Sequence, residues 1–192
     1  MSSGEQALQS LVAGNMRYVG TKLAHPNQSA ERRLEVAKGQ RPFAAILGCS
    51  DSRVPPELIF DQGLGDLFVV RVAGNVVDDV VLGSLEYAVA HLGVSLIMVL
   101  GHERCGAVEA ALKGGEAPGH VRSVVAAIAP AVEKVKGQPG DPLNNAVSAN
   151  VEMVVAQLRS SQPVLSVIVG VGKLRVVGAR YDLDSGWADL IA

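Results

Sequence analysis

The sequence predicts an α/β fold in which a mostly parallel β-sheet is flanked by helices and carries an antiparallel strand at one edge. Short, almost continuously apolar segments rich in Val, Ile and Leu alternate along the chain with longer segments of helical periodicity. Strands buried on both faces have this composition, and their alternation with helices is typical of parallel βαβ units. The chain has 192 residues, 48% of them hydrophobic, which suffices for one core. We therefore expect a single domain over residues 1–192.

Residues 1–39 are expected to form a helical arm ahead of the sheet. Apolar side chains recur at helical spacing from about Ser3 to Val19, which predicts an amphipathic helix. A stretch of Pro, Asn and Ser follows, and then a short charged helix is expected over Ala30 to Lys38, ending at Gly39.

The sheet is expected to begin after this arm. Buried strands are predicted over 43–48, 67–72, 95–101 and 164–170, with helices over 77–92, 107–113, 121–136 and 144–160 between them. Only Gly172 and Lys173 separate segment 164–171 from the last apolar segment, 174–183. So short a link cannot make a parallel crossover, and the last segment is therefore expected to be an antiparallel edge strand.

Charge and hydropathy exclude several classes of partner. The formal net charge is −2 and no run of like charge occurs, so neither nucleic acid nor an anionic membrane is expected as a partner. The longest apolar run, Val94 to Leu100, is much shorter than the roughly 20 residues that span a bilayer. The N-terminus lacks the basic and apolar regions of a secretory signal, and a cytoplasmic location is expected.

Two short motifs follow the ends of predicted strands. They are Gly48-Cys-Ser-Asp-Ser-Arg53 and Gly101-His-Glu-Arg-Cys-Gly106. Ligands of open α/β sheets bind at the carboxyl ends of the strands, so Cys49, His102 and Cys105 are expected to meet around one point. Two thiolates and one imidazole are a ligand set of catalytic Zn2+, with the fourth position left for water.

Other interpretations of these cysteines stay open. A buried cysteine often only fills space, and Cys49 and Cys105 could form a disulfide. A metal site is favoured because both motifs stand at successive strand ends and the chain has no other cysteine.

Asp51 and Arg53 form a second layer beside these ligands. A carboxylate held by a guanidinium stays ionised and oriented, so Asp51 could accept a hydrogen bond from a water on the metal. Released by Arg53, Asp51 could itself bind the zinc and close the site. A plain ion pair that caps the loop is the alternative.

The two motifs together resemble the hallmark pair of β-carbonic anhydrases of the bacterial, plant-like type. Cys-Ser-Asp-Ser-Arg is followed some fifty residues later by Gly-His-x-x-Cys-Gly, and the similarity extends to segments 11–18, 65–75, 83–89 and 177–184. The resemblance implies zinc-dependent, reversible hydration of carbon dioxide to bicarbonate and a proton. It implies a homo-oligomer, either a dimer or a dimer of dimers, with the three ligands above and, in a closed state only, Asp51 on the zinc.

Five further residues match positions that have roles in that family. Gln40 matches a glutamine that hydrogen-bonds the substrate, and Phe68 and Tyr87 match aromatic residues that wall the pocket from the neighbouring subunit. Gly106 matches a glycine whose backbone N–H faces the substrate oxygen. His91, one helical turn after Tyr87, matches a proposed proton-transfer residue, with a histidine that caps helix carbonyls as the alternative.

The resemblance also has one departure and leaves other functions open. Arg71 matches an arginine of an inhibitory bicarbonate site in some bacterial members, but Ile46 stands where those members carry tryptophan. A zinc hydrolase of carbon disulfide or carbonyl sulfide could use the same scaffold. A non-catalytic zinc-binding module could use the same ligands.

Overall fold

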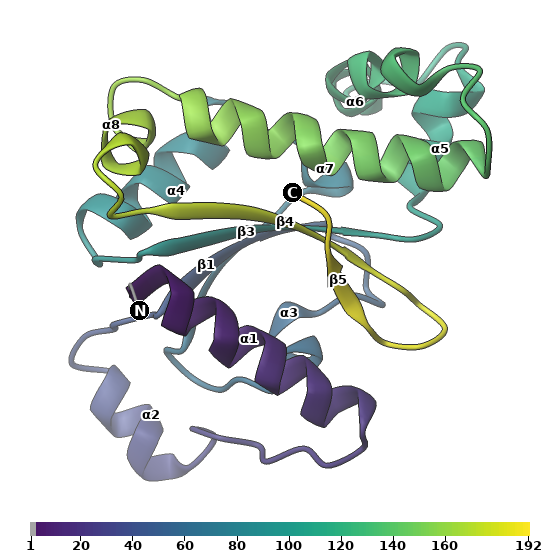
Figure 1. The fold of residues 1–192 in the computed structure, drawn as a ribbon. Helices are drawn as coiled ribbons and strands as arrows, with labels where there is room; N and C mark the ends of the chain where they lie inside the picture. The colour runs from purple at the N-terminus through teal and green to yellow at the C-terminus, as the bar shows by residue number, and fades with distance from the viewer. Residues whose placement is uncertain (1–2) are drawn as a thin grey trace.

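A five-stranded sheet forms the centre of the molecule in the computed structural model, which describes residues 3–192 (Figure 1). The strands are β1 (Ala44–Gly48), β2 (Leu67–Arg71), β3 (Leu96–His102), β4 (Arg175–Tyr181) and β5 (Ala188–Leu190). Their spatial order is β2-β1-β3-β4-β5. The pairs β1–β2, β1–β3 and β3–β4 are parallel and only β4–β5 is antiparallel. The predicted fold class is therefore confirmed.

The segment that we predicted as a fourth buried strand, 164–170, is instead the helix α8 (Leu165–Gly170). Leu165, Ile168 and Val169 lie at helical spacing against the core, whereas Val167 is 55% exposed. Only one face of the segment is covered, so it does not meet the condition for a strand buried on both faces. The predicted hairpin is consequently wrong: β4 runs parallel to β3, and the antiparallel edge strand is β5.

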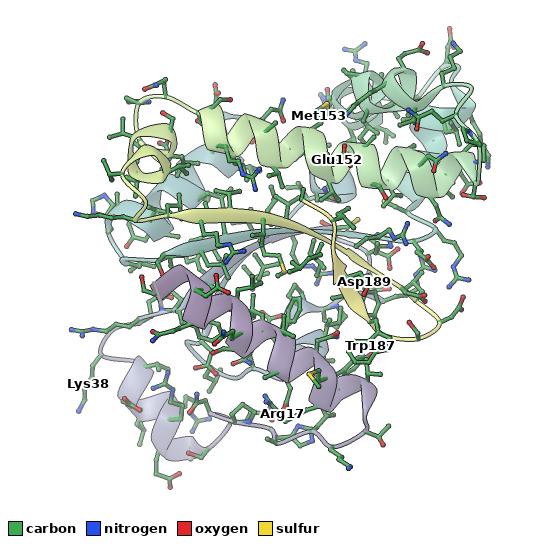
Figure 2. The ribbon with its side chains drawn as sticks, viewed as in Figure 1. Arg17, Lys38, Glu152, Met153, Trp187 and Asp189 are labelled. Atoms are coloured by element: carbon green, nitrogen blue, oxygen red, sulfur yellow. The ribbon has the colours of Figure 1, made fainter. Side chains whose placement is uncertain are left out.

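Helices cover both faces of the sheet. On one face lie α1 (Ser3–Val19), α2 (Ala30–Val36) and α3 (Pro56–Ile59), and on the other lie α4 (Asp79–Ala90), α7 (Pro142–Ser160) and α8. The labelled side chains of Arg17, on α1, and Glu152, on α7, project on opposite sides of the sheet (Figure 2). Alternate strand residues serve the two cores, with Ala45 on the α4–α7 side and Ile46 on the α1 side.

Two further helices, α5 (Gly106–Lys113) and α6 (Val121–Val135), extend the α7 side beyond the carboxyl end of β3 (Figure 1). They pack with α7 around a third apolar cluster that includes Cys49 and Cys105. A short 3₁₀ turn, Ala73–Asn75, follows β2 in the same region. Helices thus cover the carboxyl ends of β1, β2 and β3.

Short acidic side chains set where two of the helices begin. Asp78 accepts a hydrogen bond from the backbone N–H of Val81 at 2.8 Å, and Asp141 accepts one from Asn144 at 2.7 Å. A carboxylate at this position satisfies a free N–H of the first turn. These caps place the starts of α4 and α7 within two residues of the predicted starts.

Glycine allows α7 to lie directly on β3 and β4. A Cβ atom at Gly101 would stand 2.4 Å from Cγ2 of Val151, and one at Gly178 would stand 2.6 Å from Cγ1 of the same residue. No such contact is tolerated, so a side chain at either position would push α7 away from the sheet. The close packing fixes α7 over the strand that ends in His102.

A buried carboxylate ties α1 to the loop that precedes α2. Asp61 accepts hydrogen bonds from Nε of Arg17 and from the backbone N–H groups of Ala24 and His25, at 2.5, 3.0 and 3.0 Å. Burial alone would raise the pKa of Asp61, but these hydrogen bonds lower it below its ordinary value.

Over the described range 3–192, none of the helices has the length and apolar composition needed to cross a membrane.

Candidate metal centre

Neighbouring parallel strands bring the three predicted metal ligands together. Cys49 directly follows β1, and His102 is the last residue of β3, the strand next to it. Cys105 is the N-cap residue of α5. The connecting turn is tight, since Arg104 has a positive φ of 51°. All three side chains are buried.

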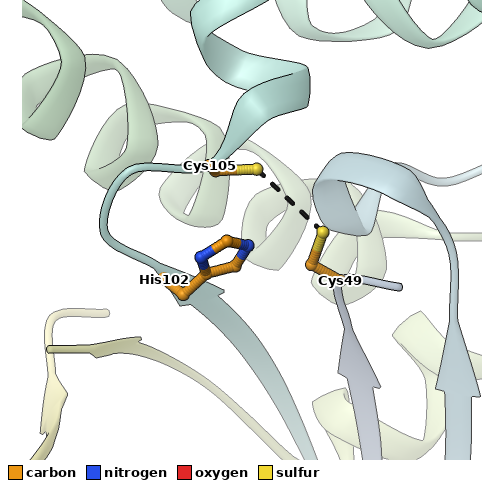
Figure 3. A group of neighbouring side chains, drawn as sticks. All are labelled: Cys49, His102 and Cys105. Carbon is orange, nitrogen blue, oxygen red and sulfur yellow. Dashed lines mark hydrogen bonds between the residues drawn. The ribbon is translucent and has the colours of Figure 1, made fainter. Parts of the chain in front are cut away.

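The ligand atoms of these residues lie within 4.8 Å of one another. The sulfur atoms of Cys49 and Cys105 are 4.0 Å apart, and the imidazole of His102 lies beside them (Figure 3). Both thiols are free, and 4.0 Å is about twice the length of a disulfide bond. A zinc ion about 2.3 Å from each sulfur would give an S–Zn–S angle of about 120°, close to tetrahedral. The geometry therefore fits a metal, and no disulfide joins the two cysteines in this structure.

The imidazole of His102 is oriented for metal binding. Its Nδ1 lies 2.8 Å from the backbone carbonyl oxygen of Glu103. A carbonyl can only accept, so Nδ1 carries the proton and Nε2 carries a lone pair. Nε2 is buried and has no hydrogen-bond partner among residues 3–192. A second group that fixes the tautomer in this way is typical of metal-binding histidines.

The thiols of Cys49 and Cys105 have pKa values that are shifted in opposite directions. A hydrogen bond from the Cys105 thiol, with others from the backbone of Gly74 and Asp51, lowers the pKa of Cys49 to about 4 despite burial. The hydrogen bond to Cys49, together with burial, raises the pKa of Cys105. The pair is thus poised to supply one thiolate readily, and the second proton must be displaced by a cation.

Asp51 and Arg53 form the predicted ion pair beside the ligands. Nε and Nη2 of Arg53 donate to the two carboxylate oxygens of Asp51 at 2.9 and 2.7 Å. These hydrogen bonds are the main reason that the pKa of Asp51 falls to about 2. Oδ2 of Asp51 lies 3.8 Å from Nε2 of His102. The carboxylate is therefore ionised, faces the ligand group and is engaged by the guanidinium through both oxygens.

Arg71 fixes the loop that carries these residues. Its Nε donates to the backbone carbonyl of Cys49 at 2.9 Å, and its Nη2 donates to that of Asp51 at 2.6 Å. The resemblance matched Arg71 only to a bicarbonate site, so this contact was not predicted. An arginine at the carboxyl end of the strand next to Cys49 is the signal in the sequence that could have indicated it.

The resemblance assigns three residues to substrate binding, and all three lie far from the predicted metal ligands of their own chain. Phe68 pairs with Ala45 in the sheet, about 13 Å along β1 from Cys49 at about 3.3 Å per residue. The ring of Tyr87, on α4, is 6.4 Å from the ring of Phe68, centroid to centroid. Gln40 precedes β1 and thus lies at the opposite end of that strand from Cys49.

The other two predicted residues lie in different places. Gly106 is the first residue of α5, next to Cys105, and its backbone is beside the ligand group. His91 is the C-cap residue of α4: its backbone N–H donates to the carbonyl of Tyr87, and the two rings are 5.1 Å apart. Only Gly106 is therefore brought to the metal ligands of the same chain.

These features define an α/β protein in which two cysteines and a histidine that could hold a metal ion meet at the carboxyl ends of parallel strands, and comparison with known proteins makes the class specific. A family model described as carbonic anhydrase matches residues 44–188. "Carbonic anhydrase 2" of Mycobacterium tuberculosis is 47% identical over 188 residues, which cover 96% of this chain and 91% of that protein. The carbonic anhydrase of Mycolicibacterium smegmatis is 43% identical with the same coverage.

Solved structures agree. A tetrameric β-carbonic anhydrase of Sordaria macrospora has a TM-score of 0.80 at 28% identity, with 97% of this chain and 98% of that chain covered. The Coccomyxa β-carbonic anhydrase in complex with acetazolamide has a TM-score of 0.78 at 29% identity, with 96% and 86% covered. The chain belongs to the carbonic anhydrase family, and these neighbours place it in the β class. The family hydrates carbon dioxide, and the comparisons do not favour the two alternative functions.

Proposed function

We propose that this chain catalyses the reversible hydration of carbon dioxide to bicarbonate and a proton, with one zinc ion held by Cys49, His102 and Cys105. The observation that carries the proposal is the Nε2 atom of His102, which is buried, has no hydrogen-bond partner in the described part of the chain and adjoins two thiol sulfur atoms. A buried acceptor of this kind destabilises the fold unless something binds it. A zinc ion would satisfy it and leave a fourth position open for water.

Zinc bound here would supply Lewis acidity that lowers the pKa of a bound water towards neutrality. The other groups belong to the chain. Asp51 is ionised above a pH of about 2 and can only accept hydrogen bonds, so it would orient the reacting water. Arg53 holds both carboxylate oxygens, and Asp51 would bind zinc only after Arg53 releases it. The backbone N–H of Gly106, at the start of α5, would stabilise charge that develops on the substrate oxygen.

We further propose a homo-oligomer, a dimer or a dimer of dimers, in which Gln40, Phe68 and Tyr87 complete the substrate pocket of a neighbouring subunit. Their distance from the ligands of their own chain supports this arrangement. The β-carbonic anhydrases of Sordaria macrospora, which are described as tetrameric, support it as well.

The N-terminal segment supports the same assembly. We propose that residues 1–192 form one domain whose segment 1–39, of which residues 1 and 2 lie outside the described range, serves as an arm towards the partner. The outer face of α1 carries exposed apolar side chains, Val12 at 41% and Met16 at 57%. We also propose a cytoplasmic location, which the two unpaired thiols support because reduced cysteines persist in that compartment.

Stopped-flow measurement of carbon dioxide hydration, with zinc quantified on the same samples, tests the proposed reaction and ligands. One zinc per chain is expected in the wild type, with loss of both zinc and turnover in Cys49→Ser and His102→Ala. His120→Ala, which removes an exposed histidine in a loop, is the matched control and should retain both. Full zinc content in Cys49→Ser would contradict the proposed ligand set, and a zinc-loaded wild type without turnover would contradict the proposed reaction.

A further inference from the structure

The sulfur of Cys49 accepts a hydrogen bond from a backbone amide outside its own motif. The N–H of Gly74 lies 3.3 Å from Sγ of Cys49, in a buried setting. Gly74 belongs to the 3₁₀ turn Ala73–Asn75, and both Gly74 and Asn75 have positive φ, 68° and 44°. Asparagine adopts this conformation more readily than most non-glycine residues, and contacts with surrounding residues hold the turn in place.

One of those contacts comes from α7. Nδ2 of Asn150 donates to the backbone carbonyl of Gly74 at 2.9 Å, and Asn150 is only 1% exposed. The two polar groups of Gly74 are thus both engaged, with the N–H directed to Cys49 and the carbonyl to Asn150. The third constraint is steric, because a Cβ atom at Gly74 would stand 2.6 Å from Cδ1 of Ile128.

Packing alone does not explain an asparagine at position 150. Its neighbours on the buried face of α7 are apolar, among them Val147, Val151 and Val154. The Oδ1 atom of Asn150 is buried, and none of the residues that the structure describes forms a hydrogen bond with it. An amide that leaves its oxygen unpaired destabilises a core relative to an apolar side chain of the same shape. The hydrogen bond to Gly74 is what the amide contributes.

We propose that Asn150 is a positioning residue for the metal centre: by holding the carbonyl of Gly74 it aims the Gly74 amide at the Cys49 sulfur and so strengthens metal binding. The inference rests on the proposed zinc ligands. A hydrogen bond to a ligating thiolate stabilises the deprotonated form that binds a metal and fixes the direction of its lone pairs. Groups that orient a metal ligand in this way typically account for a factor of about 10–100 in metal affinity.

The test compares two buried asparagines that each donate to backbone carbonyls. Asn150→Leu replaces the amide with an apolar side chain that branches at the same carbon, and Asn150→Ser, measured in parallel, removes the amide without adding bulk. Asn15→Leu is the matched control: Asn15, on α1, is 3% exposed and donates to Ile59 and Gly186 at 3.2 and 2.9 Å. Zinc affinity is measured by competition with a chelator, and the thiolate-to-metal charge-transfer band is recorded on protein reconstituted with Co2+.

We expect zinc affinity to fall about 10–100-fold in both Asn150 variants and the Co2+ band to shift to longer wavelength, because the sulfur regains electron density. Asn15→Leu should lower the melting temperature but leave the affinity and the band unchanged. Wild-type affinity and band in a folded Asn150 variant would overturn the proposal, as would an equal loss of affinity in Asn15→Leu. Absence of zinc from the wild type would instead refute the proposed metal site itself.

Discussion

Replacing Arg53 with alanine should change the orientation of the Asp51 carboxylate and leave its charge unchanged. In the wild type, Nε and Nη2 of Arg53 each donate to one carboxylate oxygen of Asp51. The backbone N–H of residue 53 also donates to Oδ1, at 2.9 Å, and this hydrogen bond survives the substitution. Arg53→Ala therefore leaves Oδ1 anchored and releases Oδ2, which is the oxygen 3.8 Å from Nε2 of His102.

A change in ionisation cannot account for the expected effect. The pKa of Asp51 is about 2 beside Arg53 and should return towards the ordinary value of about 4 without it. At pH 7 about 0.1% of such a carboxyl group is protonated, so Asp51 stays charged in both proteins. The loss must then come from orientation, and removal of a group that orients a site residue typically lowers activity about 10–100-fold. We expect kcat/KM for carbon dioxide hydration to fall by this factor at unchanged zinc content.

The assay is stopped-flow hydration between pH 7 and 9, with and without added guanidinium, which should partly restore the variant. Arg104→Ala is the matched control: its side chain is 51% exposed, against 49% for Arg53, and pairs with Asp184. It should keep wild-type turnover. Undiminished turnover in Arg53→Ala would refute the reasoning, and so would a loss that disappears at pH 9, since that would indicate protonation.

Three further predictions concern pH, stability and proton transfer. Wild-type hydration should rise from pH 7 to 9, because two thiolates make a bound metal a weaker acid than three imidazoles would; initial rates that fall over this range would contradict it. Asp61→Asn should lower the free energy of unfolding by about 2 kcal/mol at pH 7, since three donors lose a charged acceptor. Because folding lowers the pKa of Asp61, this stabilisation is complete above the unfolded-state pKa, and urea titrations should show the gap closing as pH falls through the lowered value. His91→Ala should lower kcat in dilute buffer but not kcat/KM, with recovery in concentrated imidazole; equal kcat at all buffer concentrations would remove His91 from proton transfer.

The convergence of Cys49, His102 and Cys105 was predictable because it follows from topology. Parallel strands end at one edge of a sheet, so side chains that directly follow two adjacent strands must meet. The prediction of a strand over segment 164–171 was wrong. It rested on the Val- and Ile-rich composition of the segment, which fits a strand. Whether such a segment is covered on one face or both is a tertiary property. Val167 and Val171, exposed at 55% and 64%, show that only one face is covered here.

The side chains that hold the backbone around Cys49 in place were not predictable in this way. Arg71 acts on the loop of Cys49 through a neighbouring strand, and Asn150 reaches Gly74 from a helix 76 residues further along the chain. No local pattern encodes such pairs, because they depend on how α7 settles on the sheet. The one signal in the sequence is a polar residue at a buried helical position, Asn150, among valines and alanines.

The placement of Gln40 and Cys49 at opposite ends of β1 makes the proposed assembly testable in a single experiment. If one chain's Gln40 serves its neighbour's zinc, Gln40→Ala and Cys49→Ser damage the same pocket from different subunits. Mixed dimers would then hold one intact site, made from the zinc ligands of the first variant and the glutamine of the second. Random pairing of two inactive variants makes half of the dimers mixed, so co-refolding equal amounts should restore about a quarter of wild-type turnover. If Gln40 served its own chain, every pocket in the mixture would carry a lesion and no turnover would return.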